Sequence, residues 1–200
     1  MKAKRWIPAT MAVGTIAMLA TMTGCKEETS ATTTGIDPKV VADSLFTVME
    51  ADRASYTKHV IKRVKAEGAI DANEYWEDSG NKDIPLPAQM FRMAAERAKE
   101  SKHNTSGFFY QLKSPWPINK QNKPVTDVEK EGFDFIVANK GEEPFYAEET
   151  LDGQKYFTAI YADVGVSSAC INCHNAHEDT PKTDFALGDV MGGVVLRIPM

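Results

Sequence analysis

The chain has 200 residues, with 23 Lys or Arg against 28 Asp or Glu, and its formal net charge is −5. An acidic chain without basic runs argues against nucleic acid or an anionic membrane surface as its partner. Its length is sufficient for one domain with a substantial hydrophobic core, and the sequence contains no internal repeat.

Residues 1–24 have the composition of an export signal. A basic start is followed by an apolar run, residues 11–23, which is too short for a membrane-spanning helix of about 20 residues. The run ends in Met-Thr-Gly before Cys25, which resembles the lipobox of bacterial lipoproteins. We therefore predict a lipoprotein signal peptide with Cys25 lipidated, on the periplasmic side of the inner or outer membrane. An ordinary signal peptide is the alternative.

Residues 25–36 are small and polar and include four threonines, which predicts a flexible tether. Cleavage after residue 24 would remove three basic residues and no acidic one. This leaves 20 Lys or Arg against 28 Asp or Glu and a net charge of −8. Residues 37–200 are predicted to form one domain, whose acidic surface suits a basic protein partner.

A long helix is predicted to begin after the tether, with Asp37 as its N-cap and Pro38 at the first helical position. Apolar residues recur at three- and four-residue steps from Val41 through Val48, and this stripe turns polar near Asp52. The pattern stops at Gly68. Polar groups on a core-facing stripe need partners, which a dimer seam, solvent or a cofactor pocket would provide.

The rest of the domain is predicted as a mixture of helices and strands. The expected elements are a loop (70–83), a helix (88–101) after Pro85-Leu86-Pro87, a strand (107–113), a rigid loop (114–124), a helix capped by Asp127, a hairpin (145–149 and 155–161) with Asp152-Gly153 in its turn, a loop with the segment described next, and a last strand (192–199). This order indicates an α+β domain with a small antiparallel sheet.

The most informative segment lies before the last strand and contains Cys170-Ile-Asn-Cys173-His174. At this spacing two thiols can form thioethers to the vinyl groups of one haem, while the adjacent imidazole ligates the iron. In an exported chain the motif predicts one covalently bound haem c, with Cys170 and Cys173 as anchors and His174 as proximal ligand. With Cys25 assigned to lipid, no thiol is left for a structural disulfide.

Three other interpretations of this segment stay open. His177 completes a set of four zinc ligands, although structural zinc sites usually take their ligand pairs from two separate segments. A thioredoxin-like dithiol expects a preceding strand in a βαβ setting, whereas the residues after His174 are typical of a loop. The third interpretation is a surface disulfide between the two thiols. The zinc interpretation predicts a protein without a visible chromophore.

In their order along the chain, the motifs resemble those of a family of haem-c-containing, PAS-like domains of bacterial proteins and sensor kinases. The resemblance rests on Arg53-x-x-Tyr56-x-x-x-Val60, Ile84-Pro-Leu-Pro-Ala88, Leu112-Lys-Ser-Pro115, Asn119 to Pro124, Glu129, Cys170-x-x-Cys173-His174 and Gly188-x-x-x-Gly192-Gly with Ile198-Pro199. It implies a PAS-like sheet that holds one haem, with a role in redox or ligand sensing. Trp116-Pro-Ile-Asn119 departs from the family pattern, which places an arginine beside the asparagine.

The sequence leaves the distal iron ligand open, and this ligand separates electron transfer from the binding of a small gas. His59 is the first candidate, because it shares a helix face with Tyr56, and an exposed histidine is the alternative. Met90 and Met93 follow, with the alternative that they fill the core. His103 is expected to be exposed.

Two pairs of residues are further candidates for the haem pocket. Tyr56 and Arg53 are predicted to line the haem or to hold a propionate, with helix packing and a surface ion pair as the alternatives. Trp116 and Tyr110 are candidates to pack on the porphyrin, with an ordinary place in the core as the alternative.

The predicted function is that of a lipid-anchored, periplasm-facing monohaem c protein that senses redox state or a small ligand. The sequence shows no kinase or other output region, so the signal would pass to a separate partner. The first helix is the expected docking or homodimer surface. The alternative is a monohaem electron carrier, because an acidic surface suits transient docking to a basic redox partner. No acid–base pair marks a catalytic site, and we do not expect an enzyme.

Overall fold

The computed structural model describes residues 35–200 except residues 69, 79 and 81, so the predicted signal peptide, Cys25 and most of the tether lie outside the described part. The elements are α1 (Pro38–Ser55), η1 (Tyr56–Ile61), α2 (Lys62–Glu67), β1 (Ala72–Asn73), β2 (Ile84–Pro85), α3 (Pro87–Glu100), β3 (Phe109–Lys113), η2 (Lys120–Asn122), α4 (Asp127–Ala138), β4 (Phe145–Leu151), β5 (Gln154–Val164), α5 (Ser168–Ala176) and β6 (Val190–Pro199). Helices that flank a small antiparallel sheet confirm the α+β class. Within the described part, no helix combines the length and the apolar character needed to span a membrane.

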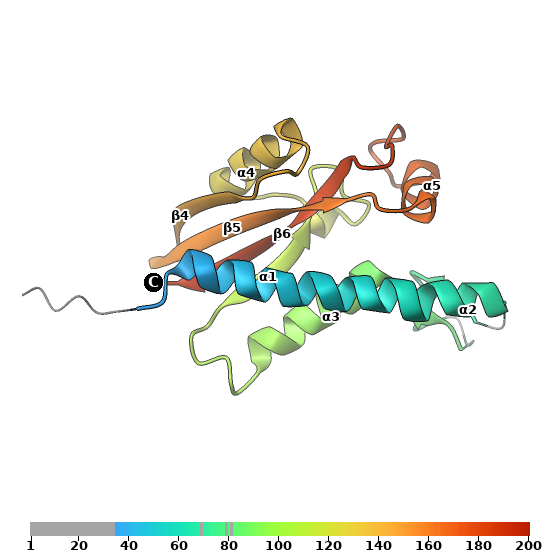
Figure 1. Ribbon diagram of the computed structural model, residues 1–200, viewed down its shortest axis with the longest axis horizontal. Helices are drawn as coiled ribbons and strands as arrows, with labels where there is room; N and C mark the ends of the chain where they lie inside the picture. Colours follow the sequence, from blue (N-terminus) through green and yellow to red (C-terminus); the bar gives the residue numbers. More distant parts are fainter. Residues whose placement is uncertain (1–34, 69, 79, 81) are drawn as a thin grey trace, which may run out of the picture. The chain divides into compact units, whose positions relative to one another are not determined.

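Four antiparallel strands form the central sheet, in the spatial order β3-β6-β5-β4. The middle of the sheet consists of β5 and β6, where Tyr161 pairs with Val194. The predicted hairpin is formed by β4 and β5, and its turn residues Asp152 and Gly153 both have positive φ. One face of the sheet is covered by α1 and α3, and the other by α4 (Figure 1).

Each face of the sheet has a core of its own, because alternate residues of a strand point to opposite faces. On the first face, Tyr161 and Leu196 pack against helix residues that include Ala42 of α1 and Phe91 of α3. On the second face, Ile160 and Val195 pack against residues of α4. The residues of α4 in this second core are Phe133 and Ile136.

The α4 face also holds an ionic cluster of Lys113, Glu129, Glu149 and Arg197, whose side chains are at most 7% exposed. Nζ of Lys113 lies 3.0 Å from the Glu129 carboxylate, and Arg197 donates to Glu129 at 2.9 Å and to Glu149 at 2.7 Å. Burial raises the pKa of Glu129, but hydrogen bonds from the Val125 N–H, Lys113 and Arg197 outweigh it, so the pKa is lowered overall. The cluster fastens the N-terminal turn of α4 to the sheet.

One helical segment extends from Pro38 to Glu67 through α1, η1 and α2 (Figure 1). Both of its predicted ends are confirmed: the Asp37 side chain accepts a hydrogen bond from the N–H of Lys39, and Gly68 has the left-handed conformation of a C-cap. The prediction missed the π-helical turn η1, which lies in the middle of the polar half. Such turns are frequent at functional sites.

The buried face of α1 differs from the predicted stripe. Leu45 of the predicted stripe packs against the core, but Val48 is 60% exposed. Ala42 is fully buried instead, and Phe46 and Met49 pack beside it. Apolar residues occur on both sides of this helix, so their spacing indicated a helix but did not determine which side faces the core.

Two further local predictions were wrong. The N-cap of α4 is Thr126 and not Asp127, because Thr126 and Glu129 exchange side-chain-to-backbone hydrogen bonds in a capping box. The segment 70–83, expected as a loop, contributes β1, which pairs in parallel with β2. Each of these strands has two residues, which is too short for a recognisable alternation.

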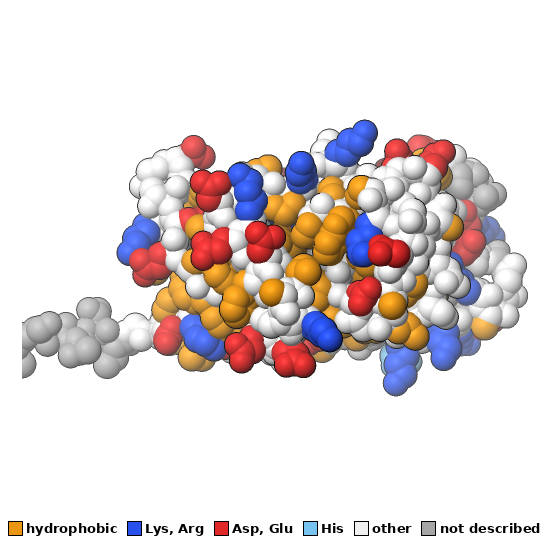
Figure 2. Space-filling model, turned by 90° about the horizontal axis from the view of Figure 1, so that it is seen from above, with side chains coloured by type: hydrophobic (Ala, Val, Ile, Leu, Met, Phe, Trp, Pro, Cys, Tyr) orange, Lys and Arg blue, Asp and Glu red, His pale blue; other side chains and the backbone are white. Residues whose placement is uncertain are grey.

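Exposed hydrophobic side chains occur along the long helix, at Val40, Val48 and Val60. On the face shown in Figure 2, acidic and basic side chains are interspersed around hydrophobic ones. The charges on that face therefore do not form one large patch of a single sign.

Candidate functional site

Cys170, Cys173 and His174 lie on α5, so this segment is helical where a loop was predicted. Ser167 caps the helix: its Oγ accepts from the N–H of Cys170 at 3.3 Å and lies 3.1 Å from Cys170 Sγ. Both thiols are free, Cys170 half-buried and Cys173 exposed. Residues three apart on a helix are neighbours on its surface, so both sulfurs can face one ligand.

Beneath α5 lies a small apolar cluster of Ile171, Phe185 and Met191, with Cys170 and Trp116 packed at its edge. The ring of Trp116 meets that of Phe185 edge-on, with the centroids 5.6 Å apart. Trp116 therefore lies with Cys170 at the edge of this apolar cluster, and its packing on a porphyrin stays a prediction.

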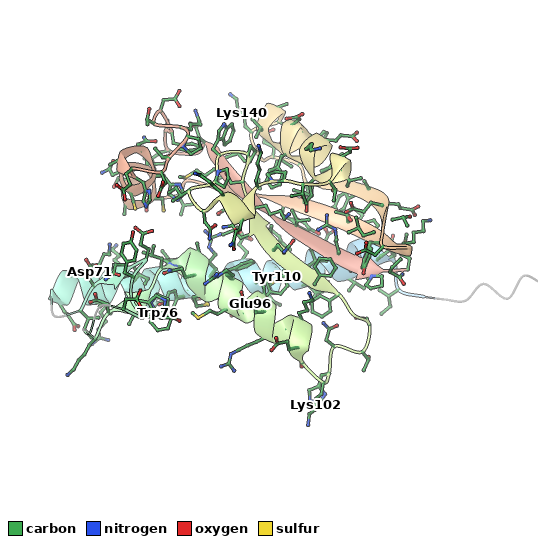
Figure 3. All side chains as sticks on the ribbon, turned by 180° about the vertical axis from the view of Figure 1, so that it is seen from behind. Asp71, Trp76, Glu96, Lys102, Tyr110 and Lys140 are labelled. Atoms are coloured by element: carbon green, nitrogen blue, oxygen red, sulfur yellow. The ribbon has the colours of Figure 1, made fainter. Side chains whose placement is uncertain are left out.

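Tyr110, the other aromatic candidate, lies in the core between β3 and α3 (Figure 3). It is 7% exposed, and its ring meets that of Phe91 edge-on at 5.1 Å between centroids. The contacts of Tyr110 are those of the core alternative.

Two features position α5 against the strands. Gly165 lies between β5 and α5, where a Cβ atom would come within 2.5 Å of Ile171 Cδ1, so a larger residue would push α5 away. The Asn175 side chain donates to the carbonyl of Phe185 and accepts from its N–H, both at 3.0 Å. The neighbouring His174 ring lies 6.3 Å from the Phe185 ring, measured between centroids.

The half-buried imidazole of His174 experiences charges of opposite sign. Burial is the main cause that lowers its pKa; Asp163 raises the pKa, and His177 and Arg53 lower it further. The pKa is lowered overall, which favours the neutral imidazole, the form that ligates a metal.

Arg53 and Asp163 form a bidentate ion pair, with Nη1–Oδ1 at 2.8 Å and Nη2–Oδ2 at 3.0 Å. Arg53 lies in the last turn of α1 and its guanidinium lies 5.9 Å from the centroid of the Phe91 ring. Asp163 lies on β5 where the pairing with β6 becomes irregular, and each of the two charged side chains is 24% exposed. This pair is the surface ion-pair alternative for Arg53, and contact with a haem propionate stays a prediction.

The other predicted pocket residues lie on η1 and α3. The Tyr56 hydroxyl donates to the carbonyl of Pro85 at 2.8 Å, which ties η1 to β2. His59 is exposed, whereas Met90 and Met93 are half-buried on α3. The roles of Tyr56 in haem binding and of His59, Met90 or Met93 as distal ligand stay predictions.

His177 follows α5 and contacts the segment around β1. Its Nε2 lies 3.2 Å from Glu74 Oε1, and its Nδ1 accepts from the N–H of Asp179 at 3.1 Å. Among the residues that the structure describes, no group of three or more His, Cys, Asp or Glu is placed to hold a metal ion. The four-ligand set of the zinc alternative is therefore not assembled, since His177 has other partners.

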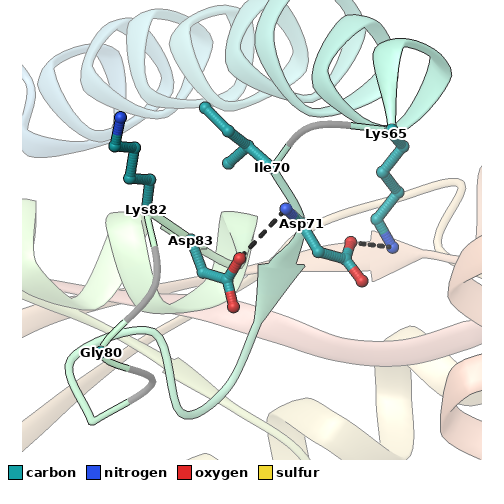
Figure 4. A pocket seen from close by; sticks show the side chains of 7 residues that line it. Lys65, Ile70, Asp71, Gly80, Lys82 and Asp83 are labelled. Carbon is teal, nitrogen blue, oxygen red and sulfur yellow. Dashed lines mark hydrogen bonds and ion pairs between the residues drawn. The ribbon is translucent and has the colours of Figure 1, made fainter.

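A pocket of about 760 Å³ lies beside the C-terminal end of α2 (Figure 4). Charged side chains account for much of its lining: Lys65 pairs with Asp71 at 3.6 Å, and the Asp83 side chain accepts from the Asp71 N–H. No predicted haem-binding residue is among its described lining residues. The pocket is therefore separate from the α5 site.

The chain was compared with models of known protein families. Residues 36–199 match the family model described as Tll0287-like. The chain belongs to the Tll0287-like family. This membership confirms the family resemblance that the order of motifs predicted.

One solved structure similar to this Tll0287-like chain is described as the crystal structure of the cyanobacterial heme-protein Tll0287. It aligns with 82% of this chain and 98% of its own, at 14% sequence identity and a TM-score of 0.49. No curated protein matches the chain.

The residues of this Tll0287-like chain fit a covalently attached haem. Two free thiols and a half-buried imidazole with a lowered pKa share one short helix, which packs against an apolar cluster. Sequence reasoning missed Asp163, Asn175 and Phe185 in these surroundings. Only Asn175 had a usable indication, its position directly after the motif; the other two lie in segments without a motif.

Proposed function

We propose that this protein binds one haem c covalently and acts as a redox or small-ligand sensor. Cys170 and Cys173 would hold the haem through thioethers, and His174 would ligate its iron. Bound in this way, the haem would supply an iron that can exchange one electron or take a small ligand. Burial lowers the pKa of the His174 imidazole and so favours its neutral form, and the ring of Phe185 lies 6.3 Å from it, measured between centroids.

The observation that carries this proposal is the placement of two thiols and the half-buried His174 imidazole on the one short helix α5. The family gives independent support, because it takes its name from Tll0287, whose crystal structure is described as that of a heme-protein. A PAS-like arrangement of the four-stranded sheet is part of the proposal. We assign the protein no catalytic reaction.

Haem attachment is tested by producing the full chain with a haem c maturation system. The expected result is a haem c spectrum that survives denaturation and acid–acetone extraction, because thioethers do not dissociate. Cys170→Ala with Cys173→Ala should abolish covalent attachment, whereas the control His103→Ala, at an exposed turn, should leave it intact. Attachment in the double variant would contradict the assignment.

The distal side decides between ligand sensing and redox chemistry. Carbon monoxide added to the dithionite-reduced protein should shift the spectrum if the sixth position is open or displaceable, which supports ligand sensing. A low-spin spectrum indifferent to the gas supports redox sensing or its alternative, electron transfer. The exposure of Cys173 favours electron exchange, since a haem attached there would have an edge near the surface. His59→Ala should change this spectrum if His59 is the distal ligand.

The cellular setting is a further part of the proposal. Lipidation at Cys25 would anchor the protein to a bacterial membrane on its periplasmic side, with residues 25–36 as tether. The signal would pass to a basic protein partner or through a homodimer. The exposed Val40 and Val48 support a docking surface on α1. Mass spectrometry of the mature N-terminus, compared with Cys25→Ala, tests the anchor.

A further inference from the structure

The Arg53–Asp163 ion pair joins α1 to β5, the strand that leads to α5. Arg53 lies in the last turn of α1, three residues before η1 begins, and Asp163 lies near the end of β5. Four residues after Asp163, Ser167 caps α5, the helix of His174. Both oxygens of Asp163 contact the guanidinium, so the pair is geometrically fixed and crosses from the long helix to the sheet.

Both charges of the pair lie within electrostatic range of the His174 imidazole. Asp163 lies two residues before Gly165, which packs against Ile171 of α5. Ile171 is three residues before His174. By their signs, Asp163 favours positive charge at the imidazole and Arg53 disfavours it, and the pKa of His174, which burial lowers most, responds to the two charges in these directions. An iron bound at this imidazole would experience the same two charges, with the same signs. Since both side chains are only 24% exposed, water screens them incompletely.

Arg53 also lies where the helix changes its hydrogen-bond pattern. Its carbonyl accepts from the N–H of Tyr56 and from the hydroxyl of Thr57, at the start of η1. Its guanidinium packs over Phe91 of α3. A change in the strength of the ion pair therefore acts directly on the junction between α1 and η1.

We propose that the Arg53–Asp163 pair couples the oxidation state of an iron at His174 to the attachment of the N-terminal helix. The inference rests on the proposed haem c site and specifies how that site is regulated. In one direction, the pair sets the reduction potential. In the other, the iron sets how firmly Arg53, and with it the end of α1, is held against the sheet.

The coupling is reciprocal by thermodynamic linkage. Reduction adds one electron, taken from an electrode, and breaks no bond to the protein, so the positive charge beside His174 falls by one. Arg53 in its paired position is repelled less by the reduced iron than by the oxidised iron, and it therefore favours reduction. Reduction favours the paired position of Arg53 by the same free energy by which paired Arg53 favours reduction. Oxidation correspondingly loosens the attachment of Arg53 to Asp163.

The test is a spectroelectrochemical titration of the haem-loaded full chain. Asp163→Asn should raise the midpoint potential, because it removes a charge that stabilises the oxidised iron. Arg53→Met should lower it and keep the packing on Phe91. Each shift should change the ratio of reduced to oxidised protein at a fixed applied potential by roughly tenfold, which is about 59 mV for one electron. Glu148→Gln, at the exposed Glu148–Lys155 pair, should cause no shift.

Opposite shifts distinguish an electrostatic role from a structural one. Two shifts of the same sign, or none, would overturn the proposal while haem binding and the proposed function stand. A parent chain that takes up no haem would instead remove the proposed function, and the inference with it. If a neutral variant fails to fold, Arg53→Lys and Asp163→Glu replace it. These variants retain the charges and should retain the midpoint potential of the parent. A tenfold change in the ratio of reduced to oxidised protein in either of them would contradict the proposal.

The reciprocal effect has its own measurement. Backbone amides of residues 50–60 should exchange hydrogen faster in the oxidised than in the reduced protein, because oxidation weakens the attachment of Arg53. The difference should disappear in Arg53→Met. Equal exchange in both oxidation states of the parent would overturn the regulatory half of the proposal.

Discussion

Two ionic groups cross this fold, and they differ in burial and in neighbours. The Glu129 cluster, formed by Lys113, Glu129, Glu149 and Arg197, is at most 7% exposed and lies between α4 and the sheet. The Arg53–Asp163 pair is 24% exposed on each side, and its two charges shift the pKa of His174 in opposite directions. Deep burial makes each charge costly to remove, while partial exposure leaves a pair weaker and adjustable. The first group therefore suits a structural role and the second a responsive one.

The largest effect is expected from Glu129→Gln. The substitution keeps the shape of the side chain but leaves Lys113 and Arg197 with one buried carboxylate between them, that of Glu149. Breaking a buried ionic group in this way costs about 3–5 kcal/mol in the free energy of unfolding. Chemical denaturation of the parent and the variant measures the difference.

Glu148→Gln is the matched control for that experiment. Glu148 also pairs with a lysine, Lys155, but their side chains are 57% and 56% exposed. The change in unfolding free energy should stay below about 1 kcal/mol, because water solvates both charges. Equal losses in the two variants would show that burial does not set the strength of the Glu129 cluster.

Gly165→Val should have the next largest effect, now at the α5 end of the molecule. The added Cβ would meet Ile171 Cδ1 at 2.5 Å, and overpacking of this kind costs about 1–3 kcal/mol. Because α5 must move, the half-buried thiol of Cys170 should react faster with a thiol reagent in the haem-free protein. Ala169→Val, at an exposed position of α5, should change neither quantity. An unchanged thiol rate in Gly165→Val would contradict the predicted packing.

Acid should weaken the Glu129 cluster by a smaller amount. The folded-state pKa of Glu129 lies below its ordinary value, because hydrogen bonds from Val125, Lys113 and Arg197 outweigh the effect of burial. Its carboxylate therefore stabilises the fold above the ordinary pKa, and this contribution is lost as the pH falls through the lowered pKa. Unfolding free energies measured across the acidic range should fall less steeply in Glu129→Gln than in the parent. Parallel slopes would contradict this assignment.

The sequence predicted local features of the fold better than contacts between residues far apart in the chain. Caps and turns are local, so both ends of the long helix and the hairpin turn at Asp152-Gly153 were predicted correctly. The Cys170-x-x-Cys173-His174 motif is local too, and it identified the candidate anchors on α5. The same local pattern did not show that these residues form a helix, because an apolar surface of distant residues, among them Phe185, supports it.

The ionic groups could not be predicted, because each joins residues far apart in the chain. Glu129 and Arg197 are separated by 68 positions, and Arg53 and Asp163 by 110. Nothing in a single sequence specifies which of many charges will meet. The π-helical turn was missed for a related reason, since its residues have the composition of an ordinary polar helix face.

The smallest effect on stability is expected from Arg53→Met, with a loss of about 1 kcal/mol or less in the haem-free protein. The pair is partly solvated, and the methionine keeps the apolar contact with Phe91. Chemical denaturation would therefore rank this variant near Glu148→Gln and far from Glu129→Gln. A loss as large as that of Glu129→Gln would mean that Arg53 is a structural anchor, and a shifted reduction potential in this variant would then reflect a distorted site. A small loss together with a lowered potential would separate the two ionic groups by role, since only the Arg53–Asp163 pair would affect the iron without holding the fold.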